Sequence, residues 1–176
     1  MTSLPQREPD LRTAILDHPS VARVRAALAG LDVQTEVVVL DGAARTAAQA
    51  AAYLGVEVAQ IANSLVFTMR AEPDAAVQPL LVLASGAHRV DTAKVADVLE
   101  IDEIGRATAD FVRESTGFVI GGVSPVGHLH PLRTLVDVSL SRYATVWAAA
   151  GHPNAVFSTT YDELLRITVG TPIETV

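Results

Sequence analysis

The sequence predicts an α/β fold of the α+β type, with a mixed, partly closed β-sheet or barrel of about seven strands surrounded by short helices. Short β-rich segments outnumber helical ones, by roughly seven or eight to four or five. The two kinds of segment do not alternate strictly, which disfavours a doubly wound parallel sheet. Hydrophobic residues make up 49% of the chain and aromatic residues only 5%, so we expect an aliphatic core.

The 176 residues are expected to form a single domain spanning 1–176. Residues 1–18 mix prolines with charges and are expected to be a loosely held lead-in. Ser20 can cap a helix over 20–29 that Gly30 ends. Thr46 can cap an alanine-rich helix that ends at Leu54-Gly55.

The remaining elements follow from β-forming runs, turn residues and caps. Strands are expected at 34–40, 64–69, 80–84, 101–107, 118–120, 135–140, 144–149 and 156–157. Besides a helical or 3₁₀ turn over 56–62, helices are expected at 92–99, 108–114 and 161–167. The polar stretch 70–78 between two of these strands predicts a hairpin.

Composition excludes several classes of function. The chain has no cysteine, which removes disulfides, thiolate metal sites and cysteine nucleophiles and is compatible with a reducing cytosol. No apolar run approaches membrane-spanning length, so we expect a cytoplasmic protein with no membrane partner. The net charge of −7 argues against a protein held on nucleic acid by its overall field, although a local basic face stays open, and we expect no DNA partner.

The segment 115–127 carries the main candidate site. Gly121 and Gly122 permit backbone angles closed to other residues, and Pro125 fixes the exit from the turn. Such a loop can turn several backbone N–H groups toward one point, which suits an anionic or oxyanionic ligand. A tight turn without a ligand is the alternative.

Three other groups of residues are weaker candidates for a functional site. His128, His130 and His152 could together hold zinc, but a His-x-His pair in a loop is common by chance, and we expect no metal and no other cofactor. Ser124 lies four residues before His128 without a Gly-x-Ser-x-Gly elbow, which disfavours a serine nucleophile. Asp137 lies inside an apolar strand, where it is either outward-facing or paired, and the outward orientation is the default.

Three segments, in this order and spacing, resemble the YbaK family, which is related to the editing insertion of bacterial prolyl-tRNA synthetases. They are residues 60–67 (QIANSLVF), 116–127 (TGFVIGGVSPVG) and 146–151 (VWAAAG). The resemblance covers roughly residues 20–170 and implies a mixed, partly closed sheet with surrounding helices. It also implies deacylation of mischarged tRNA in trans, with an aminoacyl-tRNA synthetase as a further candidate partner.

The resemblance also implies roles for particular residues. We expect a catalytic set made of Asn63 and the glycine loop Gly121, Gly122, Val123, Ser124 and Pro125. We expect substrate contacts from Thr46, Ser64, His128, Ala149, Gly151 and His152. An aminoacyl ester is already activated, so its hydrolysis mainly needs positioning and a site for the developing oxyanion.

The chain departs from the family pattern at Asn63, where most members have a lysine. Asparagine cannot place a fixed positive charge, and loss of a charged hydrogen bond costs about 1.5–3 kcal/mol. An alternative function is therefore a non-catalytic module of the same fold that binds a tRNA acceptor end, an amino acid or a synthetase. Ala149 and Val156 stand where the cysteinyl-tRNA deacylase branch carries a serine and an aspartate, so the predicted pocket is less polar.

Overall fold

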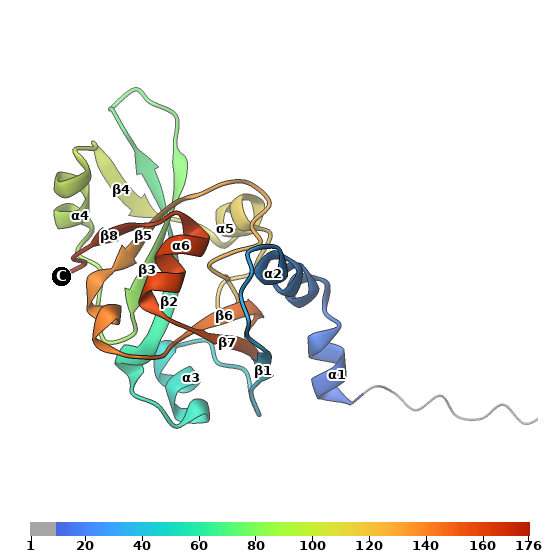
Figure 1. Ribbon diagram of the computed structural model, residues 1–176. Helices are drawn as coiled ribbons and strands as arrows, with labels where there is room; N and C mark the ends of the chain where they lie inside the picture. Colours follow the sequence, from blue (N-terminus) through green and yellow to red (C-terminus); the bar gives the residue numbers. More distant parts are fainter. Residues whose placement is uncertain (1–9) are drawn as a thin grey trace, which may run out of the picture.

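The computed structural model describes residues 10–176 and contains one mixed sheet of eight strands (Figure 1). The strands are β1 (Val37–Val39), β2 (Ile61–Arg70), β3 (Gln78–Ser85), β4 (Glu103–Arg106), β5 (Arg133–Asp137), β6 (Val146–His152), β7 (Ala155–Thr159) and β8 (Thr171–Ile173). Their order is β1-β7-β6-β2-β3-β5-β8, and β4 pairs with β2 beside this path. The pairs β2/β6, β3/β5 and β5/β8 are parallel and the others antiparallel, which confirms the predicted mixed, partly closed sheet.

Within residues 10–176, six short α-helices surround the sheet (Figure 1). They are α1 (Leu11–Leu16), α2 (Pro19–Gly30), α3 (Ala47–Leu54), α4 (Thr92–Leu99), α5 (Ala109–Thr116) and α6 (Tyr161–Thr168), with 3₁₀ turns η1 (Val58–Gln60) and η2 (Val138–Arg142). The predicted caps of α3 are confirmed: the Thr46 hydroxyl accepts a hydrogen bond from the Gln49 N–H, and Gly55 ends the helix at φ 67°. None of the helices within residues 10–176 is long and apolar enough to cross a membrane.

Strand β3 forms the centre of the core. Five of its eight residues, 80–84, are fully shielded from solvent because the sheet is covered on both faces. Leu81 and Leu83 belong to the larger cluster with α2 and α6, whereas Leu80 and Val82 pack in a second cluster with α4. The predicted hairpin is confirmed by the antiparallel pairing of β2 with β3. This buried hairpin gives β2 a rigid support for the residues at its start.

Several sequence predictions require correction. Helix α1 lies inside the predicted loose lead-in, and Ile15 anchors it in the main core with 4% exposure, while residues 1–9 lie outside the described part. Helix α2 begins at Pro19, one residue before the predicted cap. Residues 118–120 form no strand, because Phe118 is buried but Val119 and Ile120 are exposed. The strand predicted at 135–140 ends at Asp137, whose carboxylate caps η2.

Candidate functional site

A cavity of 420 Å³ lies between α3 with its preceding loop, the start of β2, strand β6 and the glycine loop. Seven residues predicted for the site line it: Thr46, Asn63, Ser64, Gly121, Val123, Ala149 and His152. Its remaining wall carries one arginine, Arg45, and is otherwise largely apolar. The apolar part includes Ala44, Ala47, Ala50, Val58, Ile61, Ala62, Trp147, Ala148, Ala155 and Val156. The fold thus brings together segments that are distant in sequence, and they enclose one cavity lined mainly by small side chains.

The glycine loop makes one edge of this cavity. Gly121 has φ +91°, a left-handed conformation that favours glycine. A Cβ atom on Gly122 would lie 3.0 Å from the Cα atom of His152, so glycine allows the loop to approach β6 closely. The Gly122 N–H donates to the Val119 carbonyl at 3.0 Å and closes a turn. Among the described residues, the N–H groups of Gly121 and Val123 have no protein acceptor, which leaves them as candidate donors to a ligand.

Arg23 of α2 holds both ends of the glycine loop. Its Nε donates to the Gly127 carbonyl at 2.7 Å and its Nη2 to the Gly117 carbonyl at 3.0 Å. The guanidinium carbon also lies 4.5 Å from the centroid of the Phe118 ring, within range of a cation–π interaction. Arg23 was not among the site residues predicted from the sequence, because its bonded residues are 104 and 94 positions away and no local pattern links them.

The second half of the loop lies behind the cavity wall. Ser124 is fully buried; its hydroxyl accepts from the Val126 N–H at 3.3 Å, and its carbonyl accepts from His128 Nε2 at 2.7 Å. Burial lowers the pKa of His128 below its ordinary 6.5; the bond to Ser124 opposes this shift, and the charge of Arg23 adds to it. Ser124, Pro125 and His128 therefore lie where they support the loop, and none of them lines the cavity.

Asn63 and Ser64 enter the cavity from the start of β2. Asn63 pairs with Ala84 of β3, so its backbone is fixed by the central hairpin. The Ser64 Oγ is buried and has no hydrogen-bond partner among the described residues. Buried hydroxyl groups in folded proteins are normally hydrogen-bonded, so an unpartnered one beside a cavity marks a position for a polar group of a ligand.

His152 and Gly151 occupy the end of β6 in different ways. The Nδ1 atom of His152 accepts from the Asn154 N–H at 3.1 Å, so the ring proton of the neutral form is on Nε2. Burial, followed by the charge of nearby His18, lowers the pKa of His152. Gly151 has φ +93°, and a Cβ atom there would lie 2.7 Å from the Ser20 carbonyl oxygen. Gly151 thus allows β6 to pack against α2 and does not line the cavity.

The three histidines considered as zinc ligands do not come together. His128 and His130 line a separate hollow beside the end of α6, whereas His152 lines the main cavity. Within residues 10–176, no group of three histidine, aspartate or glutamate side chains is placed to hold a metal ion.

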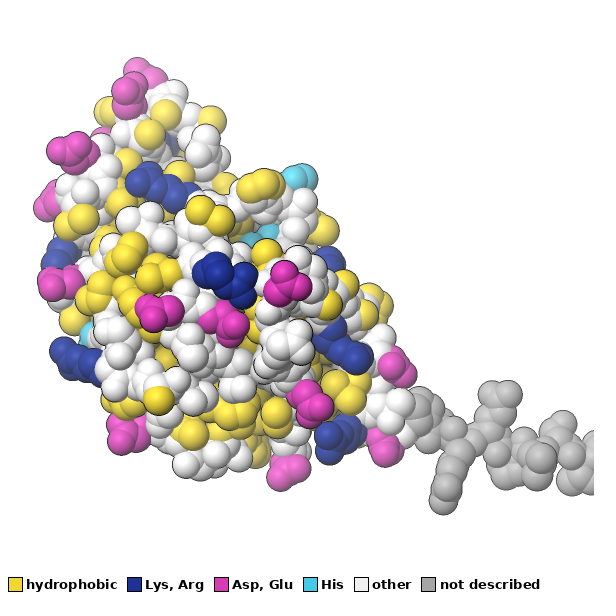
Figure 2. All heavy atoms as spheres, in the orientation of Figure 1, with side chains coloured by type: hydrophobic (Ala, Val, Ile, Leu, Met, Phe, Trp, Pro, Cys, Tyr) yellow, Lys and Arg dark blue, Asp and Glu magenta, His cyan; other side chains and the backbone are white. Residues whose placement is uncertain are grey.

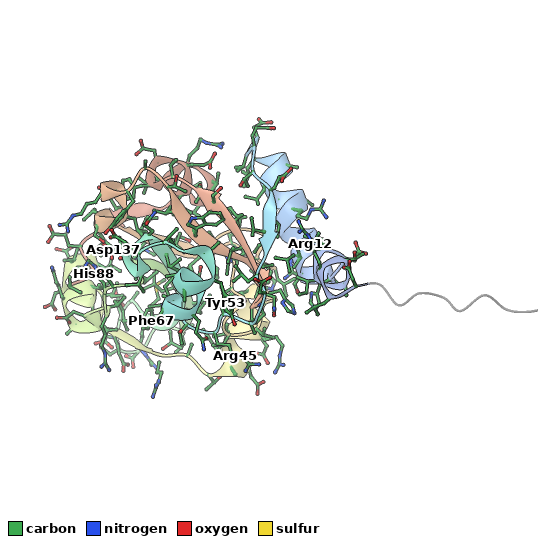
Figure 3. The ribbon with its side chains drawn as sticks, turned by 90° about the horizontal axis from the view of Figure 1, so that it is seen from below. Arg12, Arg45, Tyr53, Phe67, His88 and Asp137 are labelled. Carbon is green, nitrogen blue, oxygen red and sulfur yellow. The ribbon has the colours of Figure 1, made fainter. Side chains whose placement is uncertain are left out.

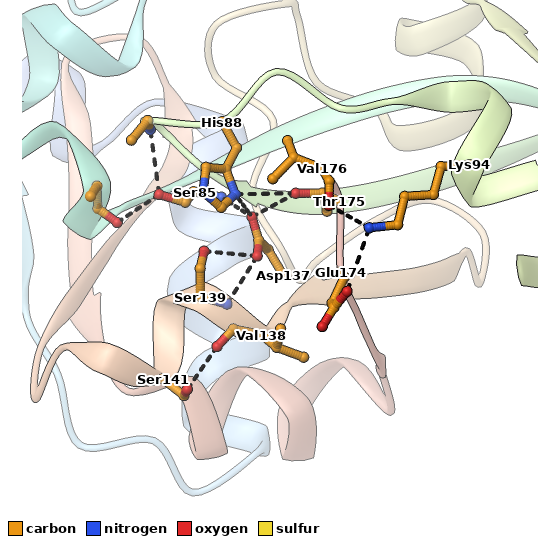
Figure 4. Close-up of polar contacts among 12 residues, drawn as sticks. Ser85, His88, Lys94, Asp137, Val138, Ser139, Ser141, Glu174, Thr175 and Val176 are labelled. Atoms are coloured by element: carbon orange, nitrogen blue, oxygen red, sulfur yellow. Dashed lines mark hydrogen bonds and ion pairs between the residues drawn. The ribbon is translucent and has the colours of Figure 1, made fainter.

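Asp137 is paired and buried, so its predicted outward orientation is wrong. The side chain is 1% exposed. Its carboxylate accepts hydrogen bonds from the Ser139 N–H and Oγ, the Ser85 N–H, the Thr175 Oγ1 and His88 Nδ1, at 2.7 to 3.0 Å (Figure 4). Burial raises the pKa of Asp137, but the bonds from Ser139, Ser85 and Thr175 outweigh it, and the net pKa lies below 3.8. Asp137 lies outside the cavity and joins structural segments.

A sequence profile of the aminoacyl-tRNA editing domain matches residues 41–167, which include the cavity and the glycine loop. The chain belongs to this family. Family membership supports aminoacyl-tRNA editing at the level of the family and agrees with the resemblance carried by the three sequence segments.

Two curated relatives and one solved structure illustrate the similarity. The uncharacterized protein YwhH of Bacillus subtilis (strain 168) is 33% identical over 145 residues, which cover 82% of this chain and 88% of YwhH. The proline–tRNA ligase of Limosilactobacillus fermentum is 32% identical over 97 residues, covering 55% of this chain but only 17% of the ligase. A crystal structure described as a candidate trans-editing enzyme for prolyl tRNA synthetase has a TM-score of 0.79 and 41% identity, over 89% of this chain and 96% of that one.

Proposed function

We propose that this protein hydrolyses the ester bond of mischarged aminoacyl-tRNA in trans, as an editing enzyme. The observation that carries the proposal is the meeting of Asn63 and Gly121 across one cavity lined by small apolar side chains. Family membership and the structural similarity to a candidate trans-editing enzyme support the same reaction.

The cavity lining favours catalysis by position and backbone dipoles. It contains no carboxylate and no cysteine, and the Nδ1 atom of neutral His152 is already an acceptor for a backbone N–H. In the proposed reaction, water adds to the ester carbonyl, and the N–H groups of Gly121 and Val123 stabilise the oxyanion. The C–O bond to the terminal ribose then breaks, and the ribose oxygen takes up a proton from the attacking water. By the family resemblance, a hydroxyl group of the same ribose helps to activate that water.

The wall of the cavity selects the amino acid. Alanines 44, 47, 50, 62 and 148 with Val58 and Val156 offer apolar contacts to the acyl side chain. The described lining residues include Arg45 but no carboxylate, so a positively charged side chain there would lose its hydration without gaining an opposite charge. The proposed substrates therefore carry an amino acid that has no positive charge and whose side chain fits beside Trp147.

The test is to incubate the purified protein with a panel of mischarged tRNAs, including tRNA(Pro) and tRNA(Cys) species, and to follow release of the amino acid. We expect hydrolysis faster than in buffer for substrates with small uncharged amino acids and full activity in the presence of a chelator. Rates equal to buffer across the panel would overturn the proposal.

Asn63 is the specific observation that favours a second candidate, a binding module without turnover, because the usual lysine charge is absent. Thermal-shift measurements with amino acids and non-hydrolysable aminoacyl-adenosine analogues separate the two functions. Stabilisation by these ligands together with no hydrolysis of the panel would establish the binding module.

A further inference from the structure

A second hollow of 720 Å³ continues from the cavity along the outer side of β2 and β4. It shares Asn63 and Leu65 with the cavity, so the two hollows meet at the start of β2. Its other lining residues are Phe67, His88, Arg89, Val90, Asp91, Thr92, Ile104, Gly105 and Arg106. In the view of Figure 3, Phe67 lies between His88 of this groove and Arg45 of the cavity.

The groove is locally basic on an acidic protein. Arg89 and Arg106 are exposed, and neither forms an ion pair or a side-chain hydrogen bond with another described residue. The one carboxylate in the lining, that of Asp91, accepts the Lys94 N–H as the cap of α4. The chain as a whole carries a net charge of −7, and the face in Figure 2 shows acidic and basic side chains mixed together. Two unpaired arginines beside the cavity therefore form a local site for anionic groups.

The groove also offers apolar surface between its charges. The half-buried side chains of Leu65, Phe67 and Ile104 lie along it. Aromatic and apolar surface between arginines is typical of sites for single-stranded nucleic acid. The bases stack on the aromatic and apolar side chains, and the phosphates bind the arginines. Guanidinium groups can in addition bind a phosphate through two parallel hydrogen bonds.

We propose that this groove binds the single-stranded nucleotides that precede the terminal adenosine of the tRNA, with Arg89 and Arg106 contacting their phosphates. The inference rests on the proposed function. If the aminoacyl ester lies between Asn63 and Gly121, the RNA chain must leave the cavity over the adjoining surface. The groove is the continuation that begins at Asn63 itself and carries positive charge that complements phosphate.

The test measures binding separately from hydrolysis. A 5′-labelled oligoribonucleotide that ends in C-C-A is titrated with the full chain by fluorescence anisotropy over a range of salt concentrations. We expect the double variant Arg89→Gln/Arg106→Gln to bind at least tenfold more weakly. The slope of log K against log salt should fall by about 1.4, since each phosphate contact on a single strand contributes about 0.7.

Arg25→Gln is the matched control, since Arg25 is an exposed arginine of α2 that lines a different hollow. It should leave affinity and salt slope unchanged. A thermal melt shows whether each variant is folded. Unchanged affinity and slope in the folded double variant would overturn the groove proposal.

Hydrolysis separates this proposal from the proposed function. If the protein is a deacylase, the double variant should raise KM much more for aminoacyl-tRNA than for the 3′-aminoacyl ester of adenosine, which lacks the upstream phosphates. Arginine-dependent binding of the oligonucleotide without any hydrolysis would support the groove and reject the deacylase. Hydrolysis with equal KM for aminoacyl-tRNA in wild type and double variant would support the deacylase and reject the groove.

Discussion

At the scale of single residues, Asn63 decides how fast the proposed reaction can be. Its amide lies beside the cavity but cannot supply a fixed charge to an oxyanion or phosphate. A charged hydrogen bond contributes about 1.5–3 kcal/mol, so we expect Asn63→Lys to raise kcat/KM for a mischarged tRNA about tenfold or more. Single-turnover deacylation measures this change, with Asn63→Ala as the control that removes the amide without adding charge. A rate for Asn63→Lys at or below wild type would show that the asparagine is adapted to its role.

Substitution of Ser64 should affect the stability of the protein and its activity in different directions. Its buried hydroxyl has no partner among the described residues, so Ser64→Ala breaks no hydrogen bond to another of these residues. We expect the melting temperature to stay the same or rise, while KM for the substrate increases severalfold because a ligand contact is lost. Thermal melts and steady-state kinetics on the same preparation test both parts.

The control for Ser64→Ala is Ser158→Ala, since Ser158 lies on β7 outside the cavity lining. It should leave KM unchanged. A lower melting temperature for Ser64→Ala with unchanged KM would contradict a role in substrate contact.

At the scale of elements, the glycine loop depends on a helix far away in sequence. Arg23→Met keeps most of the apolar stem but removes both hydrogen bonds to the loop carbonyls and the charge over Phe118. We expect the free energy of unfolding to fall by about 3–6 kcal/mol and kcat to fall with it, because two hydrogen bonds from a charged group are lost at about 1.5–3 kcal/mol each. Urea unfolding and deacylation kinetics give the two values.

Arg25→Met is the control for Arg23→Met, as an exposed arginine on the same helix. Its unfolding free energy should change by less than about 0.5 kcal/mol. Equal effects of the two substitutions would show that the loop does not depend on Arg23.

The elements that carry local signals were predictable from the sequence. Thr46 and Gly55 mark both ends of α3, and the glycine loop was located from its composition alone. Residues 118–120 were predicted as a strand from their β-forming side chains. The prediction failed because only Phe118 of the three is buried. Helix α1 was missed because its packing on the core through Ile15 is a tertiary contact.

At the scale of the whole molecule, long-range contacts were the part that the sequence could not supply. The predicted site residues separate into a set that lines the cavity and a set that does not, which consists of Gly122, Ser124, Pro125, His128 and Gly151. Periodicity indicates which residues are buried but not which buried residues face a hollow. Asp137 shows the same limit, because its partners come from segments up to 52 positions away.

The buried Asp137 cluster ties together three distant parts of the chain and should control stability in acid. Its carboxylate joins β5 to Ser85 at the end of β3 and to Thr175 after β8. The folded-state pKa lies below the ordinary 3.8, so the stabilisation is complete at neutral pH, above the unfolded-state pKa. It is lost as the pH falls below about 4 through the folded-state pKa.

We expect Asp137→Asn to lower the unfolding free energy at pH 7 by about 3–5 kcal/mol, the usual cost of breaking a buried charged cluster. The wild-type and variant stabilities should begin to converge below about pH 4 and keep converging as the pH falls through the folded-state pKa of Asp137, which lies below the ordinary value. Urea titrations at half-unit steps of pH measure both curves. Asp162→Asn, at an exposed aspartate in the first turn of α6, is the control and should show no such convergence. Parallel wild-type and Asp137→Asn curves over the whole range would mean that the charge of Asp137 does not stabilise the fold.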